Sequence, residues 1–338
     1  MRLADHTTLR VGGSATGWLV AETEPELIQA VRTADETGTP LLLLGGGSNL
    51  LVADEGFAGL VVQAKVRGIH HQDIGDLVFV TASCGEPWDG FVSACLSSGA
   101  HGLEALSGIP GDVGGTPIQN VGAYGVEVGR LIASVRVWDR QARERRDLSP
   151  QECGFAYRTS IFKEQPERWV VLAVTFALAR TGLSRIMYDQ LAELLELEVG
   201  DTALPSRIRE SVLRLRRSKG MVLDETDCDT WSAGSFFTNP IVSTQVAQGL
   251  PADCPRYPAA DGVKLSAAWL IQHAGVERGF GLNDRARVST KHTLALTNRG
   301  DATAGDLIEL AQFVRAKVIE HFGIELNPEV RLVGCSLD

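Results

Sequence analysis

The sequence lacks the features that mark membrane and secreted proteins. No apolar run approaches the ~20 residues that cross a bilayer, and the N-terminal stretch, MRLADHTTLRVGG, has no signal-peptide core. These absences predict a cytoplasmic protein that does not insert into a membrane. With 338 residues the chain can form two or three domains with cores of their own, and we expect a monomer.

Basic residues are too few for a general affinity for nucleic acid. The formal net charge is −10, whereas nucleic-acid binding needs a basic face, so an anionic ligand must be met by a local cluster of Lys and Arg. The six cysteines form no CxxC pair and show no metal-ligand spacing. We therefore expect reduced thiols and no metal site.

Glycine, by contrast, is concentrated in two loops. Six glycines lie between Gly108 and Gly125 in the stretch LSGIPGDVGGTPIQNVGAYG, which excludes a helix interior or an ordinary strand. Such a loop needs positive φ angles or the close approach of a ligand, and its free N–H groups could cradle phosphates. A glycine-rich linker is the alternative, although the interleaved apolar residues argue against it.

A second glycine loop follows an apolar run at 40–44. It reads GGGSN at 45–49 and could present N–H groups to a pyrophosphate. It is neither a Walker A loop nor GxGxxG, so taken alone it is a weak signal.

Together with three later motifs, the loops are similar to one family. The later motifs are YRTS at 157–160, GSFFTNP at 234–240 and PEVR at 328–331. In this order the five motifs resemble the UDP-N-acetylenolpyruvoylglucosamine reductases, in the form with a tyrosine-containing insert. The two glycine loops alone would suggest only the wider group of flavoproteins with the vanillyl-alcohol-oxidase type of FAD-binding fold.

The resemblance implies a fold and a cofactor. The expected class is α+β with α/β elements, in which a two-part FAD-binding module of the vanillyl-alcohol-oxidase type precedes a C-terminal α+β substrate-binding domain. We expect FAD subdomain 1 at 1–68 and 328–338, FAD subdomain 2 at 69–219 with the insert at 183–219, and the substrate domain at 220–327. FAD would be bound non-covalently, with NADPH as reductant. The FAD contacts implied are Gly45, Gly46, Gly47, Ser48, Asn49, Ser107, Gly108, Ile109, Pro110, Gly111, Gly114, Gly115, Gln119, Asn120, Gly122, Ala123, Tyr124 and Gly125.

Three residues would carry the chemistry. The resemblance assigns hydride transfer from flavin N5 to C3 of the enolpyruvyl ether and proton donation from Ser235 to C2, which gives UDP-N-acetylmuramate for peptidoglycan synthesis. Arg158 and Glu329 would hold the charge that develops on the carboxylate. On local context alone these residues also fit a surface arginine, a turn serine and a solvated carboxylate.

The substrate, UDP-N-acetylglucosamine enolpyruvate, has its own implied contacts. They are Tyr188, Arg216, Lys219, Asn239, Tyr257, Lys264 and His292. Arg216 and Lys219 lie on a basic amphipathic helix expected at 205–219, for which a solvated face is the simpler interpretation. Two rival functions remain, namely an oxidase with covalently bound flavin on the same fold and a non-catalytic nucleotide-binding protein.

Local patterns predict the other elements. Thr23 with Glu26 predicts a capped helix that ends at Gly38. The expected helices are 23–37, 88–96, 205–219, 264–273 and 301–322, and the expected strands are 7–13, 40–44, 60–62, 77–82, 134–138, 170–178, 292–298 and 328–334.

Overall fold

The computed structural model describes all 338 residues, which divide into two compact units. Unit 1 comprises residues 1–15, 47–57 and 219–338, and unit 2 comprises residues 16–46 and 58–218. Each glycine loop therefore contributes to unit 2, but the GGGSN loop leaves it after Gly46. The division of the chain into three parts stays a prediction. No helix is long and apolar enough to cross a membrane.

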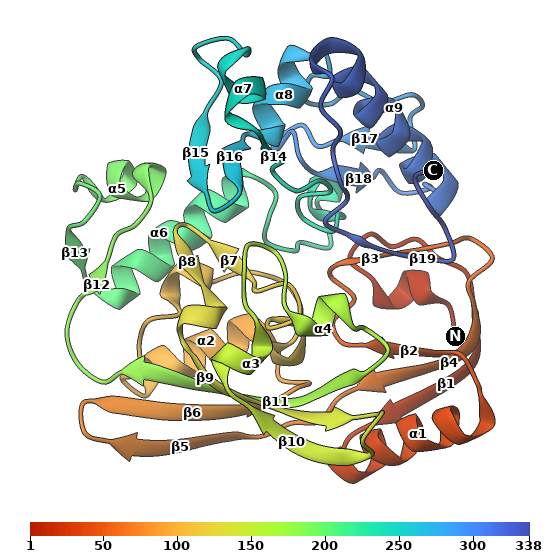
Figure 1. Ribbon diagram of the computed structural model, residues 1–338, viewed down its shortest axis with the longest axis vertical. Coiled ribbons are helices and arrows are strands. Elements are labelled where there is room, and N and C mark those ends of the chain that lie inside the picture. The colour runs from red at the N-terminus through yellow and green to blue at the C-terminus, as the bar shows by residue number, and fades with distance from the viewer. The chain divides into compact units, whose positions relative to one another are not determined.

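Two sheets form the body of unit 2 (Figure 1). The three-stranded sheet has the order β1-β4-β2, in which β2 runs parallel to β4. The five-stranded antiparallel sheet has the order β10-β9-β11-β6-β5. The strands are β1 (Ala15–Ala21), β2 (Leu41–Leu44), β4 (Phe57–Ala64), β5 (Ile69–Ile74), β6 (Leu77–Ser83), β9 (Ile132–Asp139), β10 (Glu144–Leu148) and β11 (Trp169–Ala179).

Short helices and a cluster of aromatic side chains complete the core of unit 2. Trp88 and Phe91 of one helix pack against Phe176 of β11, with ring centroids 5.3 to 5.9 Å apart. The helices before the insert are α1 (Glu24–Thr37), α2 (Trp88–Ser97), η2 (Glu104–Leu106), η3 (Val113–Gly115), η4 (Val128–Arg130), α3 (Pro150–Cys153) and α4 (Ile161–Glu164). A hairpin of β7 (Gly122–Ala123) and β8 (Val126–Glu127) closes the central glycine loop.

The insert at 183–219 has a small core of its own. It contains β12 (Ser184–Arg185), α5 (Asp189–Leu195), β13 (Thr202–Ala203) and α6 (Pro205–Ser218). Ile208 and Val212 of α6 are buried there, and Tyr124 of the central loop packs against the same cluster. The insert is thus joined to the glycine loop by apolar contact.

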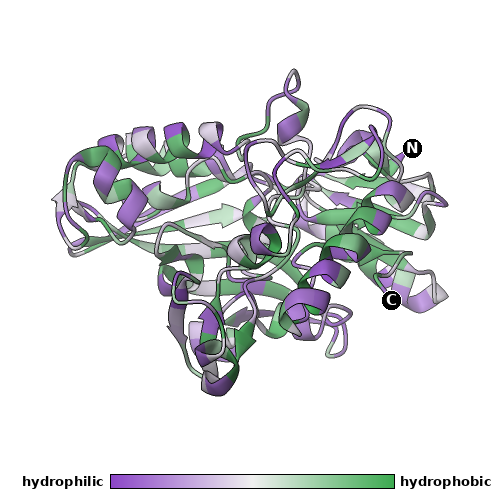
Figure 2. Ribbon diagram, turned by 90° about the horizontal axis from the view of Figure 1, so that it is seen from above, coloured by the Kyte–Doolittle hydropathy of each residue, from purple (hydrophilic) through white to green (hydrophobic).

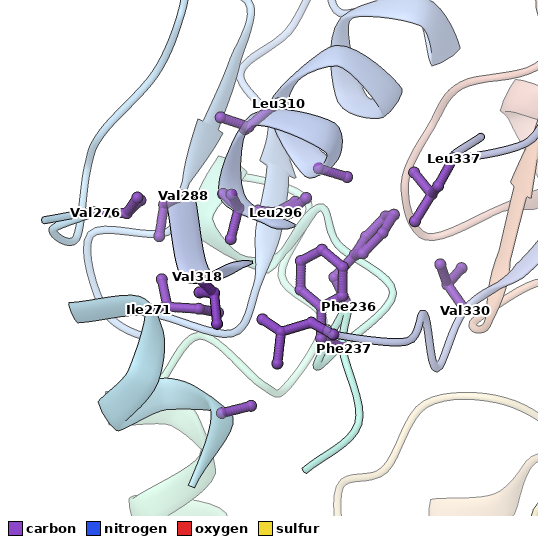
Figure 3. Packing of buried hydrophobic residues seen from close by; sticks show 14 of the residues in the cluster. Phe236, Phe237, Ile271, Val276, Val288, Leu296, Leu310, Val318, Val330 and Leu337 are labelled. Atoms are coloured by element: carbon purple, nitrogen blue, oxygen red, sulfur yellow. The ribbon is translucent and has the colours of Figure 1, made fainter. Parts of the chain in front are cut away.

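Unit 1 is built around the long helix α9 (Ala304–Phe322) and the residues of the GSFF motif. Phe236 and Phe237 are almost fully buried in its core, as Figure 3 shows, together with Val330 and Leu310. The remaining elements are η1 (Leu3–His6), β3 (Leu50–Val52), η5 (Cys228–Thr230), β14 (Ile241–Val242), α7 (Thr244–Gln248), β15 (Arg256–Ala259), β16 (Gly262–Leu265), α8 (Ala267–His273), β17 (Ala286–Val288), β18 (Leu296–Asn298) and β19 (Arg331–Val333).

Most of the predicted elements are confirmed, because their end signals are strong. Helix α1 has the full capping box of Thr23 and Glu26 and ends at Gly38, whose φ is 65°. The helices combine hydrophobic and hydrophilic residues, as expected where one face of a helix is buried (Figure 2). The final strand β19 pairs in parallel with β3, so the tail returns to the segment after GGGSN.

Five predictions of element type or extent are wrong, and two of them only place a start three residues too early, since α9 begins at Ala304 and β19 at Arg331. Residues 7–13 form no strand; η1 precedes them and the strand follows as β1. The predicted helix at 264–273 begins only at Ala267, since residues up to Leu265 form β16 and Ser266 is the N-cap. The strand expected at 292–298 begins at Leu296. These boundaries depend on caps and on hydrogen bonds to other segments, which a local apolar pattern leaves open.

Candidate active site

The central loop adopts the unusual backbone that its glycines predict. Gly108, Gly111 and Gly125 have φ angles of 71°, 115° and 83°, in the region where a side chain is strained. Asn120 and Tyr124 have positive φ as well, at 45° and 51°. Several residues with positive φ in one loop, two of which are not glycine, are typical of a loop shaped for a ligand.

Within unit 2 the two glycine loops meet. A Cβ on Gly46 would lie 2.8 Å from the Cα of Gly111, and one on Gly45 would lie 3.3 Å from Oδ2 of Asp112. The N–H groups of Gly46 and Gly111 donate no hydrogen bond within the protein. The absence of side chains therefore lets two backbones approach closely while N–H groups remain available.

Several side chains of the loop hold its shape. Ser107 is fully buried and donates to the carbonyl of Glu104 at 2.7 Å. The Asn120 amide donates to Ala156 O at 3.1 Å and accepts from Gly129 N–H at 2.9 Å. These two polar residues fix the loop from inside.

Asp89, which the sequence reading missed, anchors the start of the loop. Its carboxylate accepts the N–H of Gly108 at 2.6 Å and binds Arg209 of α6 through two hydrogen bonds, at 2.6 and 2.8 Å. Burial opposes ionisation of Asp89, but Arg209 and Gly108 outweigh it and hold the pKa of the carboxyl below its usual value. One arginine of the basic helix thus serves to attach the insert to the loop.

A second arginine of α6 reaches the far end of the loop. Arg216 is hydrogen-bonded to the hydroxyl of Tyr124, and Tyr188 packs its ring edge-on against Tyr124 with centroids 5.3 Å apart. Burial lowers the pKa of the Arg216 guanidinium and raises that of Tyr124. The structure therefore brings together Tyr188 and Arg216, two predicted substrate contacts, around one predicted FAD contact.

Arg158 is held in a strained turn of the same unit. Its φ is 54°, and its Nη2 donates to the carbonyl of Gly122 at 2.9 Å. The backbone of Ala156 and Thr159 pairs across the turn, and Lys163 Nζ donates to Arg158 O at 2.9 Å. A non-glycine residue in the left-handed region costs roughly 1–2 kcal/mol, so the contacts of the surrounding turn must hold Arg158 in this conformation.

In unit 1 the structure places Ser235 and Glu329 on adjacent backbone segments. The N–H of Glu329 donates to Phe236 O at 2.7 Å, and Phe237 forms an antiparallel bridge with Pro328. Asn49 of the GGGSN loop holds the same segment, because its Nδ2 donates to Glu329 O at 3.2 Å. Ser235 and Glu329 are only half-buried, so both can meet a ligand.

The predicted substrate contacts of unit 1 lie on several different elements. Tyr257 and Lys264 are paired across β15 and β16, with Lys264 Nζ 5.8 Å from the centre of the Tyr257 ring. Asn239 accepts the N–H of Ala267 at 2.9 Å at the start of α8, which leaves its amide nitrogen for a ligand. Lys219 follows the last residue of α6 and belongs to unit 1.

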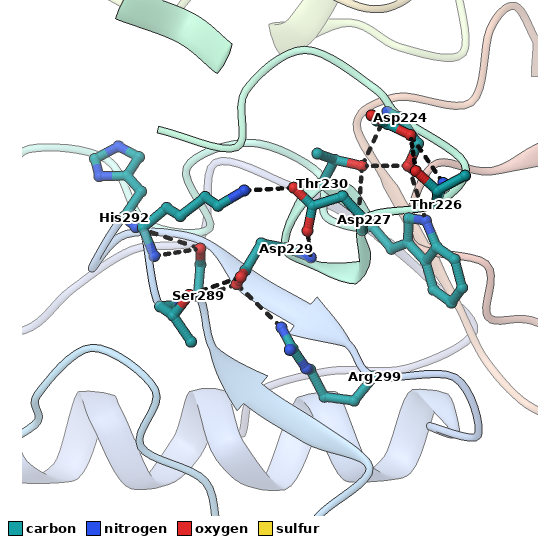
Figure 4. A network of polar contacts seen from close by, with 11 residues as sticks. Asp224, Thr226, Asp227, Asp229, Thr230, Ser289, His292 and Arg299 are labelled. Atoms are coloured by element: carbon teal, nitrogen blue, oxygen red, sulfur yellow. Dashed lines mark hydrogen bonds and ion pairs between the residues drawn. The ribbon is translucent and has the colours of Figure 1, made fainter. Parts of the chain in front are cut away.

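His292 lies in a turn that a polar network holds (Figure 4). Its N–H donates to Ser289 Oγ at 3.3 Å, and Asp229 accepts the N–H and hydroxyl of Thr290 at 2.9 and 2.7 Å. Asp229 also pairs with Arg299 at 3.0 Å. Burial would raise the pKa of Asp229, but hydrogen bonds from Thr290 and Ser289 and the positive charge of Arg299 outweigh it and hold the pKa below its usual value. Sequence reading missed Asp229, whose partner Thr290 is distant in the chain.

The residues of unit 2 fit a flavin dinucleotide on physical grounds. Close backbone contact at Gly46 and Gly111 and uncommitted N–H groups suit a diphosphate. A Cβ on Gly115 would meet nothing within 4 Å, so open space adjoins this part of the loop. The groups that would hold the cofactor are therefore present.

Comparison with known proteins agrees with this interpretation. Residues 15–146 match the family described as FAD binding domain, which makes the chain an FAD-dependent oxidoreductase. Residues 226–333 match the C-terminal domain of UDP-N-acetylenolpyruvoylglucosamine reductase.

Full-length relatives give the same result. The chain is 52% identical to the UDP-N-acetylenolpyruvoylglucosamine reductase of Thermobifida fusca, covering 99% of this chain and 97% of that protein. It is 51% identical to the corresponding reductase of Saccharopolyspora erythraea, covering 99% and 95%. The crystal structure of the UDP-N-acetylenolpyruvylglucosamine reductase from Thermus caldophilus matches with a TM-score of 0.68 at 27% identity, covering 98% of this chain and 97% of that one. The chain belongs to the UDP-N-acetylenolpyruvoylglucosamine reductase family.

Proposed function

We propose that the protein reduces UDP-N-acetylglucosamine enolpyruvate to UDP-N-acetylmuramate, with NADPH as reductant and non-covalently bound FAD as carrier. The observation that carries the proposal is the pairing of the segments of Ser235 and Glu329 through the 2.7 Å bond between Phe236 O and Glu329 N. This pairing supports the proposal because it brings a proton donor and a carboxylate together at one place in unit 1. Family membership over nearly the whole chain supports the same reaction.

The chemistry that bound FAD supplies is hydride transfer, with NADPH as the source and C3 of the enolpyruvyl ether as the acceptor. Ser235 then gives its hydroxyl proton to C2. A serine hydroxyl is a weak acid, but a carbanion or enolate beside a carboxylate is basic enough to take its proton at hydrogen-bond distance.

Arg158 and Glu329 act on the substrate carboxylate. The guanidinium of Arg158 is positioned by Gly122 O and by its strained turn, so it is available to stabilise the extra negative charge as C2 becomes enolate-like. Glu329, beside Ser235, binds the substrate carboxyl group or orients a water molecule. Its backbone segment is fixed by Asn49. Preorganisation of both groups lowers the cost of charge development.

The nucleotide sugar is bound by the residues that the family resemblance implies. Arg216 and Lys219 supply positive charge for its diphosphate, while Tyr188 packs over it beside Tyr124. Asn239, Tyr257, Lys264 and His292 supply further contacts. The glycine loops bind the FAD diphosphate through backbone N–H groups. In the three-domain division proposed from the sequence, Tyr188, Arg216 and Lys219 lie in the insert of FAD subdomain 2, and the other four contacts lie in the substrate domain.

Turnover with defined substrates tests the proposal. Purified protein should oxidise NADPH over repeated turnovers, beyond the amount that reduces its own flavin, only when UDP-N-acetylglucosamine enolpyruvate is added, and mass spectrometry should find a product heavier by two hydrogen atoms. Denaturation should release all of the flavin. Retention of flavin on the denatured chain would support a covalent-flavin oxidase, and bound nucleotide sugar without turnover would support a non-catalytic binding protein.

A further inference from the structure

Asp112, in the middle of the central loop, is an acidic residue in an unexpected place. It is 9% exposed, and its Oδ2 is buried with no hydrogen-bond partner in the protein. Although Asp112 is the N-cap residue of η3, its side chain makes no capping bond. A buried carboxylate oxygen without a partner is costly, so its retention requires an explanation.

The backbone around Asp112 aims its side chain at the other glycine loop. On one side, the chain pairs with residues 86–88 at the start of α2, where Trp88 N–H donates to Gly111 O and Val113 N–H donates to Glu86 O. On the other side, Oδ2 lies 3.3 Å from the position of a Cβ on Gly45. Asp112 therefore sits where the N–H groups proposed for the FAD diphosphate converge.

The charged groups around Asp112 do not neutralise it. Lys65 and Arg67 favour its ionised form, but burial, the largest influence, and the neighbouring Glu86 raise the pKa of Asp112 to about 6. Arg67 is partly committed to Glu86, at 3.7 Å. Burial raises the pKa of the nearby Cys84 to about 12, so that thiol stays neutral.

We propose that Asp112 binds the FAD diphosphate as a neutral carboxylic acid, with its O–H donating a hydrogen bond to a phosphate oxygen. An ionised carboxylate there would repel the diphosphate, whereas the acid supplies the donor that an anion needs. The inference rests on the proposed function only in taking FAD as the ligand. It adds a side-chain contact that depends on protonation to a site otherwise made of backbone N–H groups.

This role links FAD binding to proton uptake. Below pH about 6 the free site already carries the proton; above it, each binding event must take one up, because the diphosphate stabilises the acid further. The affinity for FAD should thus fall with rising pH, by up to about tenfold per pH unit, until the pKa of the complex is reached. A carboxylate that accepted a bond from a ribityl or ribose hydroxyl would give the opposite sign.

The test uses apoprotein freed of FAD and titrated with FAD between pH 5 and about 9, with flavin fluorescence as the readout. Wild type should show the falling affinity, while Asp112→Asn, which keeps an amide donor and cannot ionise, should show a flat profile and bind more tightly than wild type above pH about 7. Asp147→Asn, which changes an exposed carboxylate of β10, should behave as wild type.

Calorimetry gives a second measurement that needs no variant. FAD binding at pH 7, measured in buffers of different ionisation enthalpy, should take up close to one proton in wild type. Equal pH profiles for wild type and Asp112→Asn, or no proton uptake, would overturn the role of Asp112 while leaving FAD binding and the proposed reaction intact. Failure of the apoprotein to bind FAD at any pH would instead contradict the proposed function.

Discussion

Asp89 and Arg209 form a two-point ion pair that joins the insert to the central glycine loop. Nη1 of Arg209 lies 2.6 Å from Oδ1 of Asp89, the same oxygen that accepts the N–H of Gly108. One carboxylate therefore fixes both helix α6 and the first glycine of the loop. This relationship gives Arg209 a structural role, which differs from the solvated face that was the simpler interpretation of the basic helix.

Removal of Arg209 should loosen this junction. We expect Arg209→Ala to reduce the free energy of unfolding by about 1–2 kcal/mol, between the values typical of exposed and buried ion pairs, because Asp89 would keep a half-buried charge with only Gly108 as partner. Urea unfolding measures this loss. Arg207→Ala, at an exposed position of the same helix, is the control. Equal effects of the two substitutions would contradict the account.

Arg216 should act on nucleotide-sugar binding rather than on folding alone. Arg216→Lys keeps a positive charge but loses the planar donor set that meets Tyr124, so we expect the KM for the nucleotide sugar to rise roughly tenfold or more. Steady-state kinetics with Arg217→Ala as an exposed neighbour provides the comparison. An unchanged KM in Arg216→Lys and Arg216→Ala would remove this residue, and the charge assigned to it, from the substrate site.

The raised pKa of Asp112 predicts how the stability of the apoprotein depends on pH. Because the folded-state value of about 6 lies above the ordinary value of 3.8, folding favours the protonated form, and stability is lost as pH rises through this range. Asp112→Asn should therefore stabilise the apoprotein at pH about 7.5, by on the order of 1 kcal/mol after allowance for partial solvent access. Thermal unfolding at pH about 4 should show little difference, and a constant difference at both pH values would count against the assignment.

Asp229 should stabilise unit 1 and the turn that carries His292. Asp229→Ala leaves the Thr290 N–H and the Arg299 guanidinium without their acceptor, so we expect a loss of about 2–4 kcal/mol in the free energy of unfolding. Asp261→Ala, at an exposed position, should change stability by less than about 0.5 kcal/mol. Comparable stability of both variants would show that the network contributes nothing.

The sequence predicts those elements whose signals are local. Thr23, Glu26 and Gly38 define α1 because capping depends on residues three to five positions apart. The apolar runs that became β2, β6 and β11 were predicted for the same reason. The strand expected at 7–13 failed because Thr8 donates to Ser232 O, a bond from a distant segment that replaces a sheet ladder.

Those parts of the site were predictable in which the type of a single residue determines its conformation. Glycine at 108, 111 and 125 predicts positive φ, which the structure has. Asp89 and Asp229 were not predictable, since their partners Arg209 and Thr290 lie far along the chain and a lone aspartate has no distinctive pattern. Asp112 lies within the central glycine loop, but only the burial of its carboxylate without a hydrogen-bond partner distinguishes it from a solvated turn residue.

The anaerobic half-reactions of wild type and Ser235→Ala test the central claim most directly. The flavin is first reduced with NADPH, UDP-N-acetylglucosamine enolpyruvate is then added, and flavin absorbance and product are followed together. Ser243→Ala, an exposed helix cap in the same unit, is the control.

We predict rapid reoxidation and product formation in wild type and in Ser243→Ala. Ser235→Ala should be reduced by NADPH at the normal rate but form product about 10²–10⁴-fold more slowly, as expected when a general acid is lost. Product formation by Ser235→Ala at the wild-type rate would contradict its role as proton donor, and a flavin that stays reduced in wild type would contradict the proposed substrate.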